Sequence, residues 1–271
     1  MARRYETISF LSDYGHADEF VGVVHSVIRS IAPHAVVIDL VHDLPPYDLR
    51  AASLALSRSV QYVAPGIVLA IVDPGVGGSR RPIAVEVGED GEGVLVGPDN
   101  GLLAAAVALS GGATRAVELS NRAYQLPAPG PTFAGRDIFA PAAAHLAAGV
   151  PIGELGPEVD PHTLVPGLLP LSQVEAGAVV GEVLWVDRYG NCQLNVDPAE
   201  LDGFGDRITI ELPNSEVRTT ARVSTFAELG PGQVGLVVDS YGLITIVSDR
   251  ASAAEMLRLE PGTGVRLAPA V

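Results

Sequence analysis

Four short apolar segments in the first hundred residues are each followed by acidic or imidazole side chains, and this pattern constrains the fold most. The segments TISFLS, AVVIDLV, IVLAIV and GVLVGP have the composition of buried strands. The polar residues that follow them are Asp13, His42, Asp43, Asp73 and Asp99. Because ligands of layered α/β sheets bind beyond the carboxyl ends of the strands, we expect these side chains at the ligand-binding edge of a sheet.

Segments with helical periodicity alternate with these strands. In DEFVGVVHSVIRSIAP, apolar residues recur at helical spacing, including Val21, Val24 and Ile28, and a proline ends the pattern. DLRAASLALSRSVQYVAPG and GRDIFAPAAAHLAAG are also predicted to contain helices. Strands that alternate with helices indicate a layered α/β domain with a mostly parallel sheet, which we place at residues 1–165.

The pattern changes after a proline-rich segment, residues 166–178, which is predicted to be a linker. From Val179 onward helical periodicity is lost, and short apolar segments such as RITIEL and VGLVVDSYGLITIVS are separated by glycine turns. This texture is typical of a small antiparallel β-barrel or β-sandwich, and we predict the barrel. Residues 179–271 are therefore predicted to form a second, all-β domain, and two-domain proteins often bind small molecules in the crevice between the domains.

Composition narrows the choice of partners and compartment. The formal net charge is −15 and the 17 Lys and Arg are thinly spread, which argues against nucleic acid, because phosphate binding needs clustered basic residues. No apolar run approaches the roughly 18 to 20 residues that span a bilayer, and the N-terminus lacks a signal peptide pattern. The single cysteine, Cys192, excludes an internal disulfide. We expect a soluble, cytoplasmic protein without a membrane partner.

The strand-end clusters permit more than one interpretation. In SDYGHAD and VHDLPP, the side chains of Asp13, His16, Asp18, His42 and Asp43 could bind a hard divalent metal, as in metal-dependent hydrolases. Alternatively, Asp13 or Asp18 could cap the following helix.

Two further segments also permit more than one interpretation, and two histidines lie outside these clusters. VDPGVGGSRR could cradle a phosphate or form a tight hairpin. WVDRYGNCQLN could present a carboxylate, a ring and an amide to a nucleoside or amino acid, or could simply form a turn. His25 and His145 lie on apolar helix faces, where we expect core residues with satisfied hydrogen bonds.

Taken in order, these segments resemble one family. FLSDYG, VHDLPPYDLRAAS, IVDPGVGGSRR, GPDNGLL, TFAGRDIFAPAAAHLAAG and VDRYGNCQLN together resemble the S-adenosyl-L-methionine hydroxide adenosyltransferases, relatives of the fluorinase and chlorinase enzymes. The likeness runs from Ile8 to the last predicted strands. It implies an N-terminal α/β domain, a C-terminal β-barrel and a homotrimer with sites between subunits.

The resemblance also implies a reaction. Water or hydroxide attacks C5′ of the ribose of S-adenosylmethionine, and the products are L-methionine and adenosine. S-adenosylmethionine is the substrate, and neither a metal nor another cofactor is used. Rival hypotheses are a non-catalytic protein that binds S-adenosylmethionine or adenosine, a halide-using transferase and a metal-dependent hydrolase.

Binding residues in the first domain are implied residue by residue. Asp13 matches the family carboxylate that holds the ribose hydroxyls, and a buried carboxylate can do so with charge-assisted hydrogen bonds. Tyr47 stands where a ring packs near the sugar or the sulfonium, and Phe133 fits the adenosine pocket.

In the second domain, the resemblance implies that Asp187, Tyr189 and Asn191 belong to the loop that takes the adenine and the methionine end. Ser240 would bind the methionine carboxylate or ammonium.

The same resemblance implies the nucleophile. Halogen-using relatives have tyrosine in place of the acid of VDPGVGG, whereas this chain has Asp73 with Arg80 at the hydrolase spacing. Water is a poor nucleophile, so a site without a metal needs a cation to stabilise developing hydroxide and a base to take the proton. Asp73 and Arg80 would supply one of each.

Ala134 departs from the family pattern. Hydrolases of this family usually have TFHGRD, in which the histidine is the third member of an Asp-Arg-His set, and this chain has TFAGRD. Loss of a general base would slow the reaction roughly 10²- to 10⁴-fold while leaving binding intact. Three explanations stay open: a deliberate replacement of histidine, a natural enzyme that turns over slowly through Asp73 and Arg80, and a natural binding protein.

Overall fold

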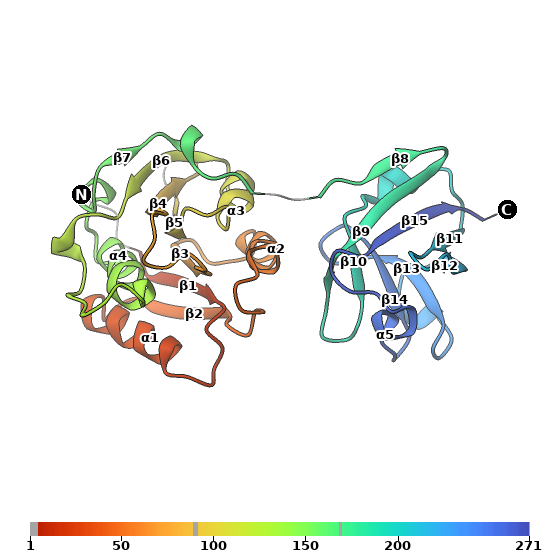
Figure 1. Ribbon diagram of the computed structural model, residues 1–271, viewed down its shortest axis with the longest axis horizontal. Coiled ribbons are helices and arrows are strands. Elements are labelled where there is room, and N and C mark those ends of the chain that lie inside the picture. The colour runs from red at the N-terminus through yellow and green to blue at the C-terminus, as the bar shows by residue number, and fades with distance from the viewer. Residues whose placement is uncertain (1–4, 89–91, 168–169, 271) are drawn as a thin grey trace. The chain divides into compact units, whose positions relative to one another are not determined.

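The computed structural model describes residues 5–88, 92–167 and 170–270. The chain divides into two compact units, Met1–Leu168 and Leu169–Val271 (Figure 1). Each unit has a hydrophobic core of its own. The predicted fold classes, an α/β domain followed by an all-β barrel, are confirmed.

The N-terminal unit is built on a seven-stranded sheet with the order β2-β1-β3-β5-β4-β6-β7. Strands β1, β2, β3, β5 and β6 run in one direction, and β4 and β7 run in the other. The sheet is therefore mostly parallel, as predicted. Its strands are β1 (Thr7–Ser12), β2 (Val36–Val41), β3 (Ile67–Ile71), β4 (Pro82–Val87), β5 (Gly93–Pro98), β6 (Ala113–Glu118) and β7 (Glu158–Val159).

Helices cover both faces of this sheet (Figure 1). Along β3, Ile67, Leu69 and Ile71 pack on the side of α1 and α4, while Val68 and Ala70 pack on the side of α2 and α3. The helices are α1 (Phe20–Ile31), α2 (Leu49–Val60), α3 (Ala104–Leu109) and α4 (Ala140–Ala147), with the π-helical turn η2 (Gly135–Phe139) before α4 and the 3₁₀ turns η1 (Arg122–Tyr124), η3 (Ile152–Glu154) and η4 (Pro161–Thr163). Within the described part of the chain, no helix is long and apolar enough to cross a membrane.

The predicted strand-end positions are confirmed. Asp13 follows β1, His42 and Asp43 follow β2, Asp73 lies two residues beyond β3, and Asp99 follows β5. Since these four strands are parallel, their carboxyl ends lie along one edge of the sheet.

The C-terminal unit is a closed barrel. Seven strands pair in the cyclic order β9-β10-β14-β13-β12-β11-β15 and back to β9, and β8 extends the sheet beside β9. The strands are β8 (Gln173–Glu175), β9 (Ala178–Val186), β10 (Cys192–Leu194), β11 (Arg207–Glu211), β12 (Val217–Arg222), β13 (Val234–Val238), β14 (Ile244–Ser248) and β15 (Gly264–Pro269). The segment 166–178, treated above as a linker, thus contains β8.

One pairing in the barrel differs from the antiparallel prediction. β12 and β13 are parallel, because the connection between them, which includes η6 (Phe226–Glu228), brings the chain back to the starting end of β12. The barrel also contains the short helix α5 (Ala253–Leu257) and the turn η5 (Pro198–Leu201), which the loss of helical periodicity did not predict.

Candidate active site

A pocket at the carboxyl ends of β1 and β3 contains most of the N-terminal residues singled out above. Its volume is about 230 Å³. Asp13, Tyr47, Asp73, Phe133 and Ala134 all line it, although they come from four separate segments of the chain. Tyr14, Phe20, Pro46, Val76, Thr132 and Gly135 complete the wall.

Asp13 and Tyr47 are linked through the Tyr47 backbone. The Tyr47 N–H donates to Asp13 Oδ2 at 2.8 Å. Tyr47 has φ of +67°, a left-handed conformation that is costly for a bulky side chain and is found mainly where the surroundings hold it. The residue is 73% exposed and lines the pocket, so the strained backbone places Tyr47 at the pocket mouth. A carboxylate offers roughly four acceptor sites, so Asp13 has lone pairs left for a ligand.

An aromatic cluster forms one wall. The ring of Phe133 lies edge-on to those of Tyr14, at 5.8 Å, and Phe20, at 5.1 Å. Burial, together with the nearby Asp13 and Asp73 carboxylates, raises the pKa of the Tyr14 hydroxyl well above its ordinary value. Tyr14 is therefore a neutral hydrogen-bond donor at physiological pH. Sequence reasoning missed Tyr14 and Phe20, although Tyr14 directly follows Asp13 in the strand-end motif.

Asp73 and Arg80 form a bidentate ion pair. Arg80 Nε donates to Asp73 Oδ1 at 2.8 Å, and Arg80 Nη2 donates to Asp73 Oδ2. Both side chains are largely buried, with 6% of Asp73 and 14% of Arg80 exposed. The guanidinium also lies over the Phe139 ring, 5.3 Å from its centre. The bidentate ion pair with Asp73 and the contact with the Phe139 ring hold the Arg80 guanidinium in one orientation beside the pocket.

Close backbone contacts fix the loop that carries Phe133 and Ala134. A Cβ on Gly77, whose φ is +76°, would lie 2.9 Å from the Pro131 oxygen, so the turn after Asp73 can touch this loop only with glycine. A Cβ on Gly135 would lie 2.2 Å from the Tyr14 hydroxyl. The turn η2 that begins at Gly135 is π-helical, a geometry that is frequent at functional sites.

Ala134 separates two cavities. It lines the pocket described above and also an adjoining cavity of about 820 Å³ whose wall includes Arg80. Only 6% of the residue is exposed. Ala134 thus lines one cavity together with Asp73 and the other together with Arg80.

In the barrel, Asp187 organises its own turn. Its Oδ1 accepts from the backbone N–H of Tyr189 at 2.8 Å and of Asn191 at 2.9 Å, and its Oδ2 accepts from Asn191 Nδ2 at 2.7 Å. These bonds correspond to the turn interpretation of Asp187. They also fix the orientation of the Asn191 amide.

Tyr189 and Asn191 line a pocket of about 550 Å³ on the barrel unit. Phe226, Arg250 and four other residues, Ser248, Asp249, Ala251 and Ser252, complete its wall. Ser240 is not among the residues that line this pocket; it lies on the exposed turn between β13 and β14. Phe226 and Arg250 were missed because no local motif marks them: they follow unrelated strands.

Family models match both units of the chain. The N-terminal domain of the SAM hydroxide adenosyltransferases matches residues 8–156, and the C-terminal domain matches residues 181–266. The chain belongs to the S-adenosylmethionine hydroxide adenosyltransferase family. The resemblance inferred from the sequence is therefore confirmed.

Individual relatives extend this match over the whole chain. A protein of Salinispora tropica named (R)-S-adenosyl-L-methionine hydrolase is 42% identical, and the match covers 96% of this chain and 97% of the relative. A fluorinase of Actinoplanes is 26% identical, with 97% of each chain covered. The crystal structure of a conserved protein from Thermotoga maritima has a TM-score of 0.88 at 31% identity, covering 96% of this chain and 99% of that one.

Near the site of this adenosyltransferase family member, histidines and acids contact one another or backbone groups. His16 lies 3.2 Å from Asp43, and Asp13 accepts from the Tyr47 backbone. Within the residues that the structure describes, no group of three His, Cys, Asp or Glu side chains is arranged to hold a metal ion. Helix capping by Asp13 or Asp18 is wrong, because the N-cap residue of α1 is Glu19 and no side chain makes a capping hydrogen bond there.

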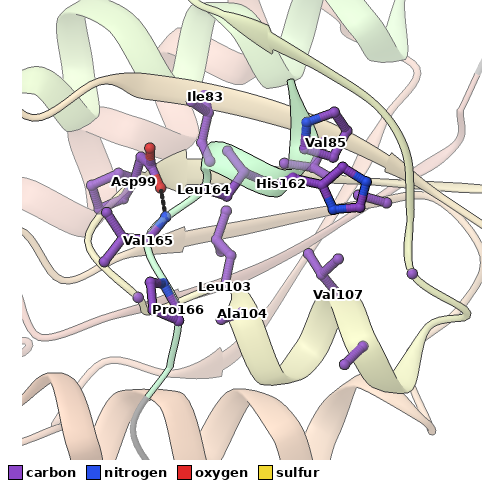
Figure 2. A pocket seen from close by; sticks show the side chains of 16 residues that line it. Ile83, Val85, Asp99, Leu103, Ala104, Val107, His162, Leu164, Val165 and Pro166 are labelled. Atoms are coloured by element: carbon purple, nitrogen blue, oxygen red, sulfur yellow. Dashed lines mark hydrogen bonds between the residues drawn. The ribbon is translucent and has the colours of Figure 1, made fainter. Parts of the chain in front are cut away.

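A separate apolar pocket of about 320 Å³ lies beside α3 (Figure 2). None of the implied site residues lines it, but the strand-end residue Asp99 does. Asp99 is fully engaged there. Its Oδ1 accepts from the Val165 N–H at 2.8 Å, and its Oδ2 accepts from Arg81 Nε at 2.9 Å and from Arg81 Nη2. Asp99 therefore ties the segment around Val165 to the sheet.

Proposed function

We propose that this chain hydrolyses S-adenosyl-L-methionine to adenosine and L-methionine. Family membership and the hydrolase name of the 42% identical relative support the proposal. The observation that carries it is the buried Asp73–Arg80 pair, which stands at a pocket lined by a carboxylate and several aromatic rings.

The N-terminal pocket suits the ribose and the sulfonium. Asp13 accepts hydrogen bonds from the ribose hydroxyls with its remaining lone pairs. Tyr47, Phe133 and Phe20 offer aromatic faces and edges around the sugar, and aromatic faces attract onium cations. On the barrel unit, a pocket of its own offers the Tyr189 ring, the Asn191 amide and the Phe226 ring, groups that suit an adenine or an amino acid.

The reaction is a displacement at C5′. The oxygen of water forms a bond to C5′ as the C5′–S bond breaks, and the electron pair of that bond goes to sulfur, so the sulfonium becomes the neutral thioether of methionine. The attacking water loses a proton. Arg80, held by Asp73, stabilises negative charge on the oxygen, and Asp73 or solvent takes up the proton. The aromatic wall excludes bulk water from the carbon.

The alanine at position 134 is the reason why we expect turnover to be slow. A methyl can neither accept a proton nor orient water, and it occupies the position where the resemblance implies histidine. The second candidate function, binding without turnover, is supported by the same observation. We do not include a metal or cofactor in the proposal, and we keep the homotrimer as a prediction that light scattering tests: the particle should have three times the mass of the chain.

The test is product release from S-adenosylmethionine, measured for this chain and for Asp73→Asn. We expect slow, equimolar release of adenosine and methionine that the substitution abolishes and that a chelator leaves unchanged. Binding without release would favour the second candidate. Loss of activity with chelator would favour a metal-dependent hydrolase, and chloride-dependent formation of a 5′-chloro nucleoside would favour a halide transferase.

A further inference from the structure

A buried imidazole lies directly behind the ribose-binding turn, and the proposed reaction does not use it. His42 follows β2 and is 1% exposed. Its ring packs edge-on to Phe10 at 4.5 Å. Burying a polar ring in so dry a position is costly unless polar groups lie close to its nitrogens.

His42 holds both ends of the turn that carries Asp13 and Tyr14. Its Nδ1 lies 2.7 Å from Ser12 Oγ, and its backbone oxygen accepts from the Gly15 N–H at 2.8 Å. Ser12 is itself fully buried, and its Oγ accepts from the Tyr14 N–H at 3.3 Å. The side chain and the backbone of one residue thus fix the turn on either side of Asp13.

The second ring nitrogen lies near a carboxylate that biases the tautomer. His42 Nε2 lies 3.0 Å from Asp39 Oδ1, and the same oxygen is 2.8 Å from His25 Nε2 on α1. The contact of His42 with Asp39 lacks hydrogen-bond geometry, but the negative charge of Asp39 favours the tautomer with the proton on Nε2, and Nδ1 then accepts from the Ser12 hydroxyl. Burial lowers the pKa of His42, which keeps the ring neutral against the opposing effect of Asp39.

We propose that His42 is a positioning residue for ribose recognition: as a neutral imidazole it holds Ser12 and Gly15 so that Asp13 faces the ribose hydroxyls. This inference rests on the proposed function, because it takes from it the role of Asp13. Asp13 has one further restraint, the Tyr47 N–H, which lies on another loop. Without the His42 side chain, the turn would lose the hydrogen bond to Ser12 that fixes its Ser12 end.

The experiment compares the binding of adenosine with that of 2′,3′-dideoxyadenosine to the full-length chain by calorimetry. The readout is the ratio of the two dissociation constants. For the unmodified chain we expect adenosine to bind roughly ten- to a hundredfold more tightly, the scale of hydrogen bonds to a charged group. The dideoxy compound lacks the groups that Asp13 would hold, so its affinity reports an intact pocket.

Three variants separate positioning from general stability. His42→Phe fills the space without nitrogens, and Ser12→Ala removes the same hydrogen bond from the other side; both should lower the ratio at least fivefold while dideoxyadenosine affinity stays constant. His42→Asn places an amide near the position of Nδ1 and should keep most of the ratio. Because Ser12→Ala is a small change, it provides the test even if His42→Phe fails to fold.

The outcomes are distinct. An unchanged ratio in His42→Phe or Ser12→Ala would overturn the positioning role while leaving the proposed function intact. A ratio near one in the unmodified chain would overturn the ribose role of Asp13, and the positioning role with it. An unchanged ratio accompanied by equal losses of affinity for both ligands would assign His42 to fold stability alone.

Discussion

Replacing Ala134 by histidine should accelerate methionine release more than any other single change in this chain. Ala134 has helical backbone angles, φ −58° and ψ −27°, which histidine adopts without strain. Its methyl faces the pocket of about 230 Å³ and the adjoining cavity of about 820 Å³, so an imidazole has room on either side. One ring face would then stand near the Asp73–Arg80 pair, where the attacking water is proposed to bind.

The expected gain follows from general-base catalysis. A positioned base contributes roughly 10²- to 10⁴-fold, and at about 1.36 kcal/mol per factor of ten this lowers the barrier by about 2.7 to 5.4 kcal/mol. Lower helix propensity should cost at most about 0.7 kcal/mol of stability, so the rate effect greatly exceeds the effect on folding. Substrate affinity should change little, because Asp13 and the aromatic wall are untouched.

The assay is the release of adenosine at saturating S-adenosylmethionine between pH 5 and 8. Because only a neutral imidazole accepts a proton, the rate of Ala134→His should rise with pH through a value near 6.5. Ala134→Gln is the matched control: it is polar and of similar size but has no basic nitrogen. If Ala134→Gln is as fast as Ala134→His, or if the histidine variant gains nothing, residue 134 does not supply a base and the reasoning fails.

Three further predictions concern neighbouring features. Arg80→Lys keeps the charge but loses the two-pronged bond to Asp73, so turnover should fall roughly 10²- to 10³-fold with stability nearly unchanged, and an unaltered rate would contradict the role of the fork. Tyr47→Gly removes the ring and should therefore weaken substrate binding. It also relieves a left-handed conformation that costs roughly 1 to 2 kcal/mol, so the unfolding midpoint should not fall. A large loss of stability would show that the ring is structural. Burial lowers the pKa of His145, so the unfolded chain takes up a proton below about pH 6.5 before the folded chain does, and stability should fall from pH 7 to pH 5; in His145→Phe, which keeps a ring against Tyr124, urea titrations should show a smaller fall.

The sequence predicted the strand-end positions well, for a physical reason. Buried parallel strands are continuous apolar runs, so their carboxyl ends are visible in the sequence, and the topology of an α/β sheet brings those ends to one edge. Asp13 and Asp73 were therefore correctly expected at the same edge. Their assignment to ribose and water came from the family resemblance, since spacing alone also allowed capping or metal binding.

What the sequence could not predict depends on contacts between distant segments. The Tyr47 N–H reaches Asp13 across 34 residues, and it does so through a left-handed backbone that no tyrosine prefers. The Tyr14, Phe20 and Phe133 cluster joins two segments more than a hundred residues apart. In the barrel, the parallel pairing of β12 and β13 depends on the path of a connection, which leaves no periodic signal.

The geometry of the Asp73–Arg80 pair also explains why a third group should matter so much. Both oxygens of Asp73 already accept hydrogen bonds from Arg80, so taking up a proton at either oxygen would break one of them. The pair can therefore stabilise negative charge on the attacking oxygen, but Asp73 is a poor acceptor for the proton of the attacking water. In the proposed reaction the proton of the attacking water passes either to Asp73, which then loses one of its hydrogen bonds from Arg80, or to solvent, and we expect an imidazole at position 134 to offer a single direct transfer instead. A catalytic site can therefore keep its substrate pocket and its electrostatic stabilisation and still be slow for want of one proton acceptor.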